Sequence, residues 1–233
     1  MFFKKDSSKN SVIDKKFIIG KSSSFAVQES YKTLRTNLMF SLSKKGCKKI
    51  LITSSNANEC KSTTCINLAK VISENGYRVL LLDCDLRLSC MAVSLDVMEK
   101  PGLSDVLVNM APMNKAIQNV TRNLDILVAG TVPPNPSELI GSAQMKDLMD
   151  SLESQYDYII IDAPPVGLVT DAVLLSVYVD GYIMVVRKNY ANKDTIDKCL
   201  RDMQVSNARM LGFVMTDAKR STADKYQNYY YQK

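Results

Sequence analysis

Two aliphatic runs in this chain end in aspartate, and a turn that carries a lysine precedes both of them. Three leucines run directly into Asp83, with Asp85 two residues further on, and three isoleucines run directly into Asp162. An aliphatic run that stops at aspartate is typical of a buried parallel strand whose carboxyl end brings a carboxylate to a ligand crevice. Because Lys61 and Ser62 follow the upstream turn, the three segments together predict a site for nucleotide phosphate.

The turn before Lys61 has part of the chemistry of a P-loop. In a P-loop, backbone N–H groups and a helix N-terminus hold the phosphates, the lysine contacts the terminal phosphates, and the following hydroxyl binds magnesium. Lys61 and Ser62 supply the last two parts, but Ser55 and Cys60 stand where the strict pattern has glycine. The strand expected before the turn and the helix expected after it support the assignment. The alternative is a lysine at an ordinary helix start.

The three aspartates could divide the work of a phosphate site. Asp83 and Asp85 lie two residues apart at a strand end, so both can approach one site, where one would help hold hydrated magnesium while the other accepts a hydroxyl proton. Arg87 could neutralise phosphate or pin a carboxylate. Asp162, followed by two prolines that fix the chain, is expected to be a Walker B carboxylate. The alternatives are aspartates that cap a helix and a plain end of a buried strand.

These residues need a mostly parallel sheet to bring them together, and the apolar pattern predicts one. The expected strands are Lys49–Ser54, Arg78–Asp83, Leu124–Val128, Tyr158–Asp162, Gly181–Arg187 and Met210–Thr216. The expected helices are Ser62–Asn75, Ser142–Gln155, Asp171–Tyr178 and Asn192–Val205. Alternation of strands and helices predicts an α/β fold of the P-loop NTPase type, with helices on both faces of the sheet and ligands at its carboxyl edge.

Length and composition predict a single domain with two polar ends. The chain has 233 residues, of which 46% are hydrophobic, enough for a sizeable core. The Ser- and Lys-rich residues 1–25 are expected to form a flexible arm, residues 26–217 the domain and residues 218–233 a polar tail. We find no apolar run near the roughly 20 residues of a membrane-spanning helix and no signal peptide, so a cytosolic protein is expected.

Charge and cysteine content argue against several other classes of protein. The six cysteines include no Cys-x-x-Cys pair and the chain has no histidine, which argues against a zinc or haem site and favours free buried thiols. The formal net charge of +6 is modest, and no motif that reads a groove or stacks on bases accompanies it, so no nucleic-acid partner is expected. Basic ends fit an acidic partner or an anionic membrane surface equally well.

The motifs together resemble the bacterial tyrosine kinases, or BY-kinases, the cytosolic autokinases of capsule and exopolysaccharide systems. The segment from Asp83 to Arg87 resembles the Walker A′ motif of that family, and it is the most specific of the matches. Asp162 and the Ala-Pro-Pro after it resemble its Walker B motif, and Lys61-Ser62-Thr63-Thr64 resembles the end of its Walker A motif. The resemblance extends from about Glu29 to the C-terminus.

Two further features of the chain fit the same family. Glu29, Lys32 and Arg35 resemble its Glu-x-x-Arg-x-x-Arg helix, which builds a ring-shaped homo-oligomer, with Lys32 in place of the first arginine. The alternative for these three residues is a solvated helix surface. A cluster of tail tyrosines resembles the phosphate acceptors that the family modifies on neighbouring subunits, and a polar tail could extend into another active site. The acceptors expected here are Tyr226, Tyr229, Tyr230 and Tyr231.

The resemblance implies transfer of phosphate from Mg-ATP to a tyrosine hydroxyl. It implies that Lys61 neutralises the β and γ phosphates, that Ser62, Asp85 and Asp162 hold magnesium, and that Asp83 is the base, although Asp83 and Asp85 could exchange roles. The residues expected to contact nucleotide are Asn58, Glu59, Cys60, Lys61, Ser62, Thr63 and, where the family commonly has an asparagine that reads adenine, Thr216. It also implies a separate membrane protein whose cytosolic tail activates the kinase at the inner face of the membrane.

The turn departs from the family in ways that keep two other functions open. Ala57, Asn58 and Cys60 stand where the family usually has proline, glycine and glycine, and a residue other than glycine is strained wherever φ must be positive. A scaffold that has lost catalysis is therefore one alternative. The other is an ATPase of the partition or division-site type, but these carry a signature lysine where this chain has Asn56. We favour the active kinase.

Overall fold

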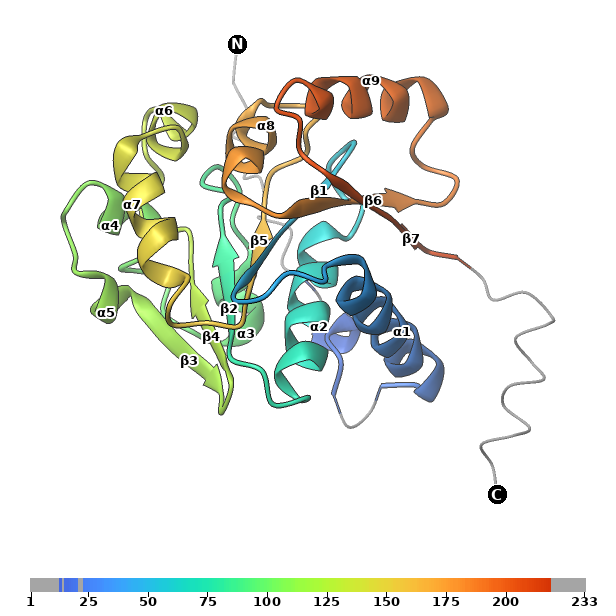
Figure 1. Ribbon diagram of the computed structural model, residues 1–233, viewed down its shortest axis with the longest axis horizontal. Coiled ribbons are helices and arrows are strands. Elements are labelled where there is room, and N and C mark those ends of the chain that lie inside the picture. The colour runs from blue at the N-terminus through green and yellow to red at the C-terminus, as the bar shows by residue number, and fades with distance from the viewer. Residues whose placement is uncertain (1–12, 14, 21–22, 219–233) are drawn as a thin grey trace, which may run out of the picture.

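The computed structural model describes residues 13, 15–20 and 23–218. Within these residues seven strands form one sheet in the order β3-β4-β2-β5-β1-β6-β7 (Figure 1). The strands are β1 (Lys48–Ser54), β2 (Val79–Asp83), β3 (Ile117–Thr121), β4 (Leu124–Leu127), β5 (Tyr158–Asp162), β6 (Gly181–Arg187) and β7 (Met210–Thr216). Neighbouring strands are parallel except β3 and β4, which are antiparallel. The expected α/β fold with a mostly parallel sheet is confirmed.

Helices cover both faces of the sheet. They are α1 (Phe25–Ser41), α2 (Lys61–Ser73), α3 (Met91–Leu95), α4 (Leu103–Leu107), α5 (Met113–Ala116), α6 (Pro136–Ile140), α7 (Ala143–Leu152), α8 (Asp171–Leu175) and α9 (Lys193–Gln204), with short 3-10 helices η1 (Lys15–Phe17) and η2 (Ser176–Tyr178). Polar side chains begin two of the longer ones, since the Ser142 hydroxyl accepts the N–H of Met145 and the Asn192 side chain accepts that of Thr195. No helix of the described residues has the length and apolar content to cross a bilayer.

The central strands β1, β2 and β5 are largely buried on both sides, because alternate aliphatic side chains face opposite layers. In β2, Leu80 and Leu82 pack with residues of α4, α7, α8 and α9, whereas Leu81 packs on the other face with residues of α1, α2 and α3. In Figure 1, α1 and α2 accordingly lie on one side of the sheet and α7, α8 and α9 on the other. Two hydrophobic layers therefore hold the strand ends that carry the aspartates.

Strand register brings the predicted site together. In the parallel pair of β2 and β5, Asp83 lies directly beside Asp162, and Ile52 of β1 lies on the other side of Asp162. The turn that follows β1 leads into α2 at Lys61. The lysine and the aspartates therefore meet at the carboxyl edge of the central strands, as expected for a doubly wound sheet.

The six expected strands and the four expected helices agree with the structure to within a few residues. Strand β3 was not expected, since its sequence Ile-Gln-Asn-Val-Thr carries three polar side chains and it pairs at the edge, antiparallel to β4. The short helices α3, α4, α5 and α6 were also missed, because four or five residues show too little apolar periodicity to be recognised.

The described part of the expected flexible arm packs against α2, which differs from expectation. The backbone N–H of Ile19 donates to the Asn67 side chain at 2.8 Å, and the Asn67 amide donates to the carbonyl of Phe17 at 2.9 Å. Ile19 is buried. One polar side chain of α2 thus satisfies two backbone groups of residues 15–20. The predicted tail lies outside the described residues beyond position 218.

Gly167 allows the loop after β5 to touch the turn after β1. A Cβ atom added at Gly167 would lie 2.2 Å from the carbonyl oxygen of Ser55, so Gly167→Ala is expected to force the two loops apart and lower the free energy of unfolding by about 1–3 kcal/mol. Denaturant titration measures this. The control is Gly20→Ala, because a Cβ there meets nothing closer than 4.0 Å. Equal stability of the two variants would show that the loops can separate without cost.

Candidate active site

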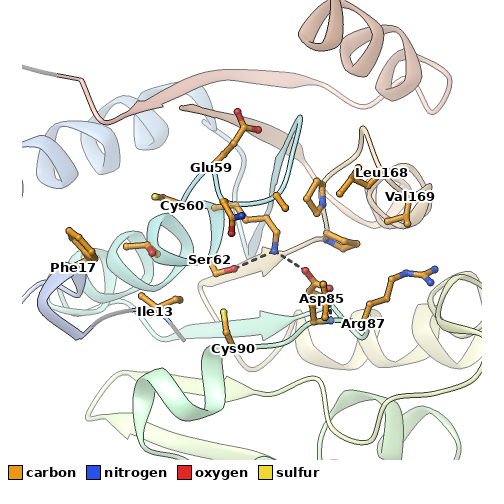
Figure 2. Close-up of a pocket in the computed structure, with 17 residues that line it drawn as sticks. Ile13, Phe17, Glu59, Cys60, Ser62, Asp85, Arg87, Cys90, Leu168 and Val169 are labelled. Carbon is orange, nitrogen blue, oxygen red and sulfur yellow. Dashed lines mark hydrogen bonds and ion pairs between the residues drawn. The ribbon is translucent and has the colours of Figure 1, made fainter. Parts of the chain in front are cut away.

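A pocket of about 510 Å³ opens at the carboxyl edge of the sheet (Figure 2). Loops from several parts of the chain form its wall, together with the segment before α1. The lining consists of residues 57–63, Asp85, Arg87, Leu88, Cys90, Pro164, Pro165, Leu168, Val169, Ile13 and Phe17. The volume is within the range typical of small-molecule sites.

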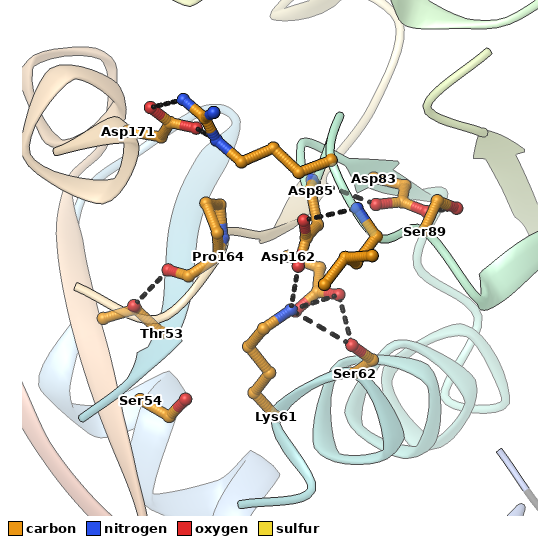
Figure 3. A network of polar contacts seen from close by, with 12 residues as sticks. Thr53, Ser54, Lys61, Ser62, Asp83, Asp85, Ser89, Asp162, Pro164 and Asp171 are labelled. Carbon is orange, nitrogen blue, oxygen red and sulfur yellow. Dashed lines mark hydrogen bonds and ion pairs between the residues drawn. The ribbon is translucent and has the colours of Figure 1, made fainter. Parts of the chain in front are cut away.

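Lys61 lies between two of the predicted carboxylates (Figure 3). Its amine donates to Asp85 at 3.1 Å and to both carboxylate oxygens of Asp162 at 3.2 Å, and the Ser62 hydroxyl donates to Asp162 at 2.5 Å. Burial lowers the pKa of Lys61, but the charges of Asp162 and Asp85 outweigh it and raise that pKa above its usual value. The amine is therefore a fixed positive charge at the pocket.

Asp83 lies beside this group but has a different environment. Its side chain is fully buried. The carboxylate accepts hydrogen bonds from the Ser89 hydroxyl at 2.5 Å and from the backbone N–H of Asp85 at 3.1 Å. Burial, assisted by the nearby charge of Asp162, raises the pKa of Asp83 to about 7, while the hydrogen bond from Ser89 acts in the opposite direction. A carboxyl group with a pKa near neutrality is suited to accept a proton.

The turn before α2 adopts the backbone conformation that glycine normally supplies. Asn58 has φ of 62° and Cys60, which directly precedes α2, has φ of 66°. Both values lie in the left-handed region, which asparagine tolerates better than cysteine. These are two of the three positions where the chain was expected to depart from a glycine-rich loop. The turn therefore has the positive φ angles of a glycine-rich loop, but it has them at two residues that are strained by this conformation.

Two residues expected to contact nucleotide support the turn with their side chains. Glu59 is 1% exposed, and its carboxylate accepts the Ser55 hydroxyl at 2.8 Å and the N–H of Asn56 at 2.7 Å. The Thr216 hydroxyl donates to the Glu59 carbonyl at 3.1 Å, and Thr216 does not line the pocket. Their direct contact with nucleotide stays a prediction, as it does for Thr63.

Arg87 pins a carboxylate, one of the two roles expected for it. Its guanidinium contacts both oxygens of Asp171, at 3.0 and 3.2 Å, and donates to the Ser137 hydroxyl at 2.9 Å. Asp171 is fully buried at the start of α8. The pair links the loop after β2 to α8, so Arg87 fixes the wall of the pocket while its side chain still lines it.

The three residues of the predicted oligomer helix lie on α1 and have different surroundings. Lys32 and Glu29 form an ion pair at 2.8 Å. Arg35 reaches across to α2, where it donates to the carbonyl of Val71 at 2.8 Å, and its Nε atom is buried without a hydrogen-bond partner in the part of the chain that the structure describes. A fully solvated helix surface therefore does not describe Arg35. The role of these residues in a ring stays a prediction.

Several residues at the site carry no clear signal in the sequence. Cys90 lines the pocket from a segment without regular structure, and Ser89 just before it does not line the pocket but donates a hydrogen bond to Asp83. Ile13 and Phe17 come from the segment expected to be an arm. Their apolar side chains, in a stretch otherwise rich in lysine and serine, were the one signal that this segment could pack on the domain.

Comparison with known proteins places these features in a family. Residues 47–210 match the family model described as an AAA domain. The chain is 35% identical to the tyrosine-protein kinase YwqD of Bacillus subtilis over 86% of this chain and 85% of that protein. It is 32% identical to the putative tyrosine-protein kinase CapB of Staphylococcus aureus over 88% of this chain and 89% of that protein.

A solved structure agrees with the sequence comparison. The crystal structure of the chimerical protein CapA2B2 has a TM-score of 0.83 and 32% sequence identity to this chain, and the match covers 90% of this chain and 92% of that one. The relatives match over nearly their whole length, so the likeness includes the lysine turn and both aspartate-ended strands. On this sequence and structural similarity, the chain belongs to the bacterial tyrosine kinase family.

Proposed function

We propose that this protein transfers the γ-phosphoryl group of ATP to tyrosine hydroxyls and so regulates capsular or exopolysaccharide biosynthesis. The observation that carries the proposal is the position of the Lys61 amine, within 3.2 Å of Asp85 and Asp162 and next to buried Asp83. A lysine at the start of a helix, with carboxylates for metal and for proton transfer, is what phosphoryl transfer needs, since positioning and charge neutralisation supply most of its rate.

The donor atoms of the site fit Mg²⁺. Asp85 and Asp162 offer carboxylates and Ser62 a hydroxyl within one hydrogen-bonded group, and magnesium is commonly held by one or two carboxylates together with substrate phosphates. No group of three or more acidic, cysteine or histidine side chains among the described residues could hold a metal by protein atoms alone. When bound, magnesium would neutralise charge on the phosphates.

Of the two aspartates that could act as the base, we propose Asp83 and not Asp85. Asp85 accepts a hydrogen bond from Lys61, whereas Asp83 accepts from Ser89 and from a backbone N–H. Asp85, whose carboxylate already contacts the positively charged Lys61 amine, is suited to hold the metal ion. The buried carboxylate with the pKa of about 7 is suited to take the proton of the tyrosine hydroxyl.

The pH dependence of the reaction tests this assignment. Asp83 accepts a proton only when it is ionised. The kinetic parameter kcat/KM for ATP reports the free enzyme, so it is expected to rise about tenfold per pH unit below pH 7 and to level off above that pH. Ser89→Ala removes a hydrogen bond that lowers the pKa of Asp83, and is expected to move the rising limb to higher pH. A limb that stays in place would assign the titration to another group.

The acceptors we propose are Tyr226, Tyr229, Tyr230 and Tyr231, on a neighbouring copy in a ring built through α1. All four lie outside the described residues. We further propose that the cytosolic tail of a separate membrane protein activates the enzyme and recruits it to the inner face of the membrane. The support is the family resemblance of the tyrosine cluster and of the helix that contains Glu29, Lys32 and Arg35.

Replacement of the four tail tyrosines by phenylalanine tests the acceptor assignment. The variant is expected to lose most of the phosphate found by intact mass after incubation with Mg-ATP and the activator tail. The control replaces Tyr190, a half-exposed tyrosine of the folded domain that lies under the Arg187 guanidinium, and is expected to keep the phosphate. An unchanged phosphate count in the fourfold variant would place the acceptors elsewhere.

A further inference from the structure

We infer that Glu59 is a positioning residue that holds the glycine-poor turn in the shape needed for phosphate. The residue lies between the two strained positions, Asn58 and Cys60. In Figure 2 its carboxylate points away from Ser62 and Asp85, and it accepts the N–H of Arg187 in β6. Its side chain therefore acts on the backbone of the turn, whose N–H groups would face the phosphates.

The contacts of Glu59 link the turn to three strands of the sheet. The carboxylate accepts the Ser55 hydroxyl and the Asn56 N–H just after β1, at 2.8 and 2.7 Å, and the N–H of Arg187 in β6 at 3.2 Å. Its carbonyl accepts the hydroxyl of Thr216 in β7 at 3.1 Å. Hydrogen bonds to an ionised acceptor are the strong ones, and those of Glu59 are shielded from water.

The turn needs such support because of its own sequence. Asn58 and Cys60 have φ of 62° and 66°, a region that L-residues disfavour and that asparagine tolerates better than cysteine. Without glycine, other conformations of the turn compete with the one that cups phosphate. The observed affinity for nucleotide falls in proportion to the fraction of molecules in the competent conformation. Glu59 raises that fraction by favouring the shape in which all its contacts form.

The effect of Glu59 is expected to depend on the two strained residues beside it. If the turn is strained, removal of Glu59 lowers the competent fraction and with it the affinity. If Asn58 and Cys60 are replaced by glycine, which adopts positive φ without penalty, the competent fraction is already close to one and Glu59 matters little. The inference rests on the proposed function, because it assumes that the turn binds nucleotide.

The experiment compares four proteins by calorimetric titration with Mg-ATP: the natural chain, Glu59→Ala, Asn58→Gly/Cys60→Gly, and the triple variant. Glu59→Ala is expected to weaken Kd by about tenfold or more in the natural turn and by only about twofold in the glycine turn, because the competent fraction cannot exceed one. Glu59→Gln keeps an acceptor for Ser55 and Asn56 and is expected to recover part of the affinity. Glu74→Ala, an exposed change at the end of α2, is the control and should leave Kd unchanged.

Equal losses in both turns would overturn the inference, since Glu59 would then act independently of the strained residues. If none of the four proteins bound ATP, the proposed function would fail at this site. Melting temperatures of the same four proteins without nucleotide separate the two failures. The inference predicts a smaller drop on loss of Glu59 in the natural turn, which relaxes into its competing conformations and so relieves its strain, than in the glycine turn, and equal drops would overturn it whatever the result with ATP.

Discussion

Lys61→Met is expected to reduce tyrosine phosphorylation by roughly 10³-fold. The Lys61 amine is the cation that contacts Asp85 and Asp162, and in the proposed mechanism it meets the charge that develops on the transferred phosphate. Removal of one preorganised donor to such a charge costs on the order of 10²–10³ in rate, and loss of a full positive charge from a buried site belongs at the upper end. Phosphate incorporation measured over time with Mg-ATP and the activator tail gives the ratio.

Loss of the fold has to be separated from loss of chemistry in this variant. Removal of Lys61 leaves the carboxylates of Asp85 and Asp162 in a buried site without the cation that contacts both, so a lower melting temperature is also expected. Lys146→Met is the matched control, because it removes the same charge from an exposed ion pair on α7. Intact phosphorylation in a folded Lys61→Met protein would show that the turn is not the phosphate site.

Asp83→Asn is expected to lower kcat by about 10²–10⁴, the usual contribution of a general base, while the affinity for Mg-ATP changes little. Asparagine keeps the shape of the side chain, and it can still accept the N–H of Asp85 and donate to Ser89, so the contacts seen for Asp83 are preserved. The loss would then be one of proton acceptance. Rapid-quench measurement of phosphate transfer, with ATP affinity measured separately, distinguishes the two quantities.

Asp96→Asn is the control for this substitution, because Asp96 is exposed and its left-handed backbone suits asparagine. Asp85→Asn provides the contrast: loss of a metal carboxylate is expected to raise the magnesium concentration needed for activity. If Asp85→Asn instead flattened the pH profile and Asp83→Asn raised the magnesium requirement, the two roles assigned here would be exchanged.

The central sheet could be predicted from the sequence because its signals are local and strong. Aliphatic runs such as Ile159–Ile161 between polar segments identify buried parallel strands, and the register of Asp83 beside Asp162 follows from two strands that end alike. Strand β3 (Ile117–Thr121) has no such signal, since its pairing with β4 is decided by their contact at the sheet edge. The short helices between β2 and β5 are likewise products of packing.

The central residues of the site could be predicted from the sequence, but the residues and contacts that hold them in place could not. Lys61, Ser62 and the aspartates are recognisable by position along the chain, and the structure brings them to one edge of the sheet. The partner of Arg87 is Asp171, 84 positions later, and no spacing rule connects them. Glu59 was expected to touch nucleotide, and only the fold shows that its carboxylate turns back to the strands.

The sequence predicts strain in the turn only if certain positions have positive φ. The sequence shows which glycines are absent, and whether a position needs positive φ depends on the path of the backbone into α2. The structure shows that Asn58 and Cys60 both need it, whereas Ala57 does not. Whether a turn with these residues still binds ATP productively is decided by a measurement of kinase activity.

The most direct test of the account is the intact mass of the natural protein after incubation with Mg-ATP and the cytosolic tail of its membrane activator, beside Asp83→Asn and Asn58→Gly/Cys60→Gly. We expect phosphate-sized increments on the natural protein and on the glycine variant, mapping to tail tyrosines, and none on Asp83→Asn. Increments on the glycine variant alone would contradict the account and identify the natural chain as a scaffold disabled at its phosphate-binding turn.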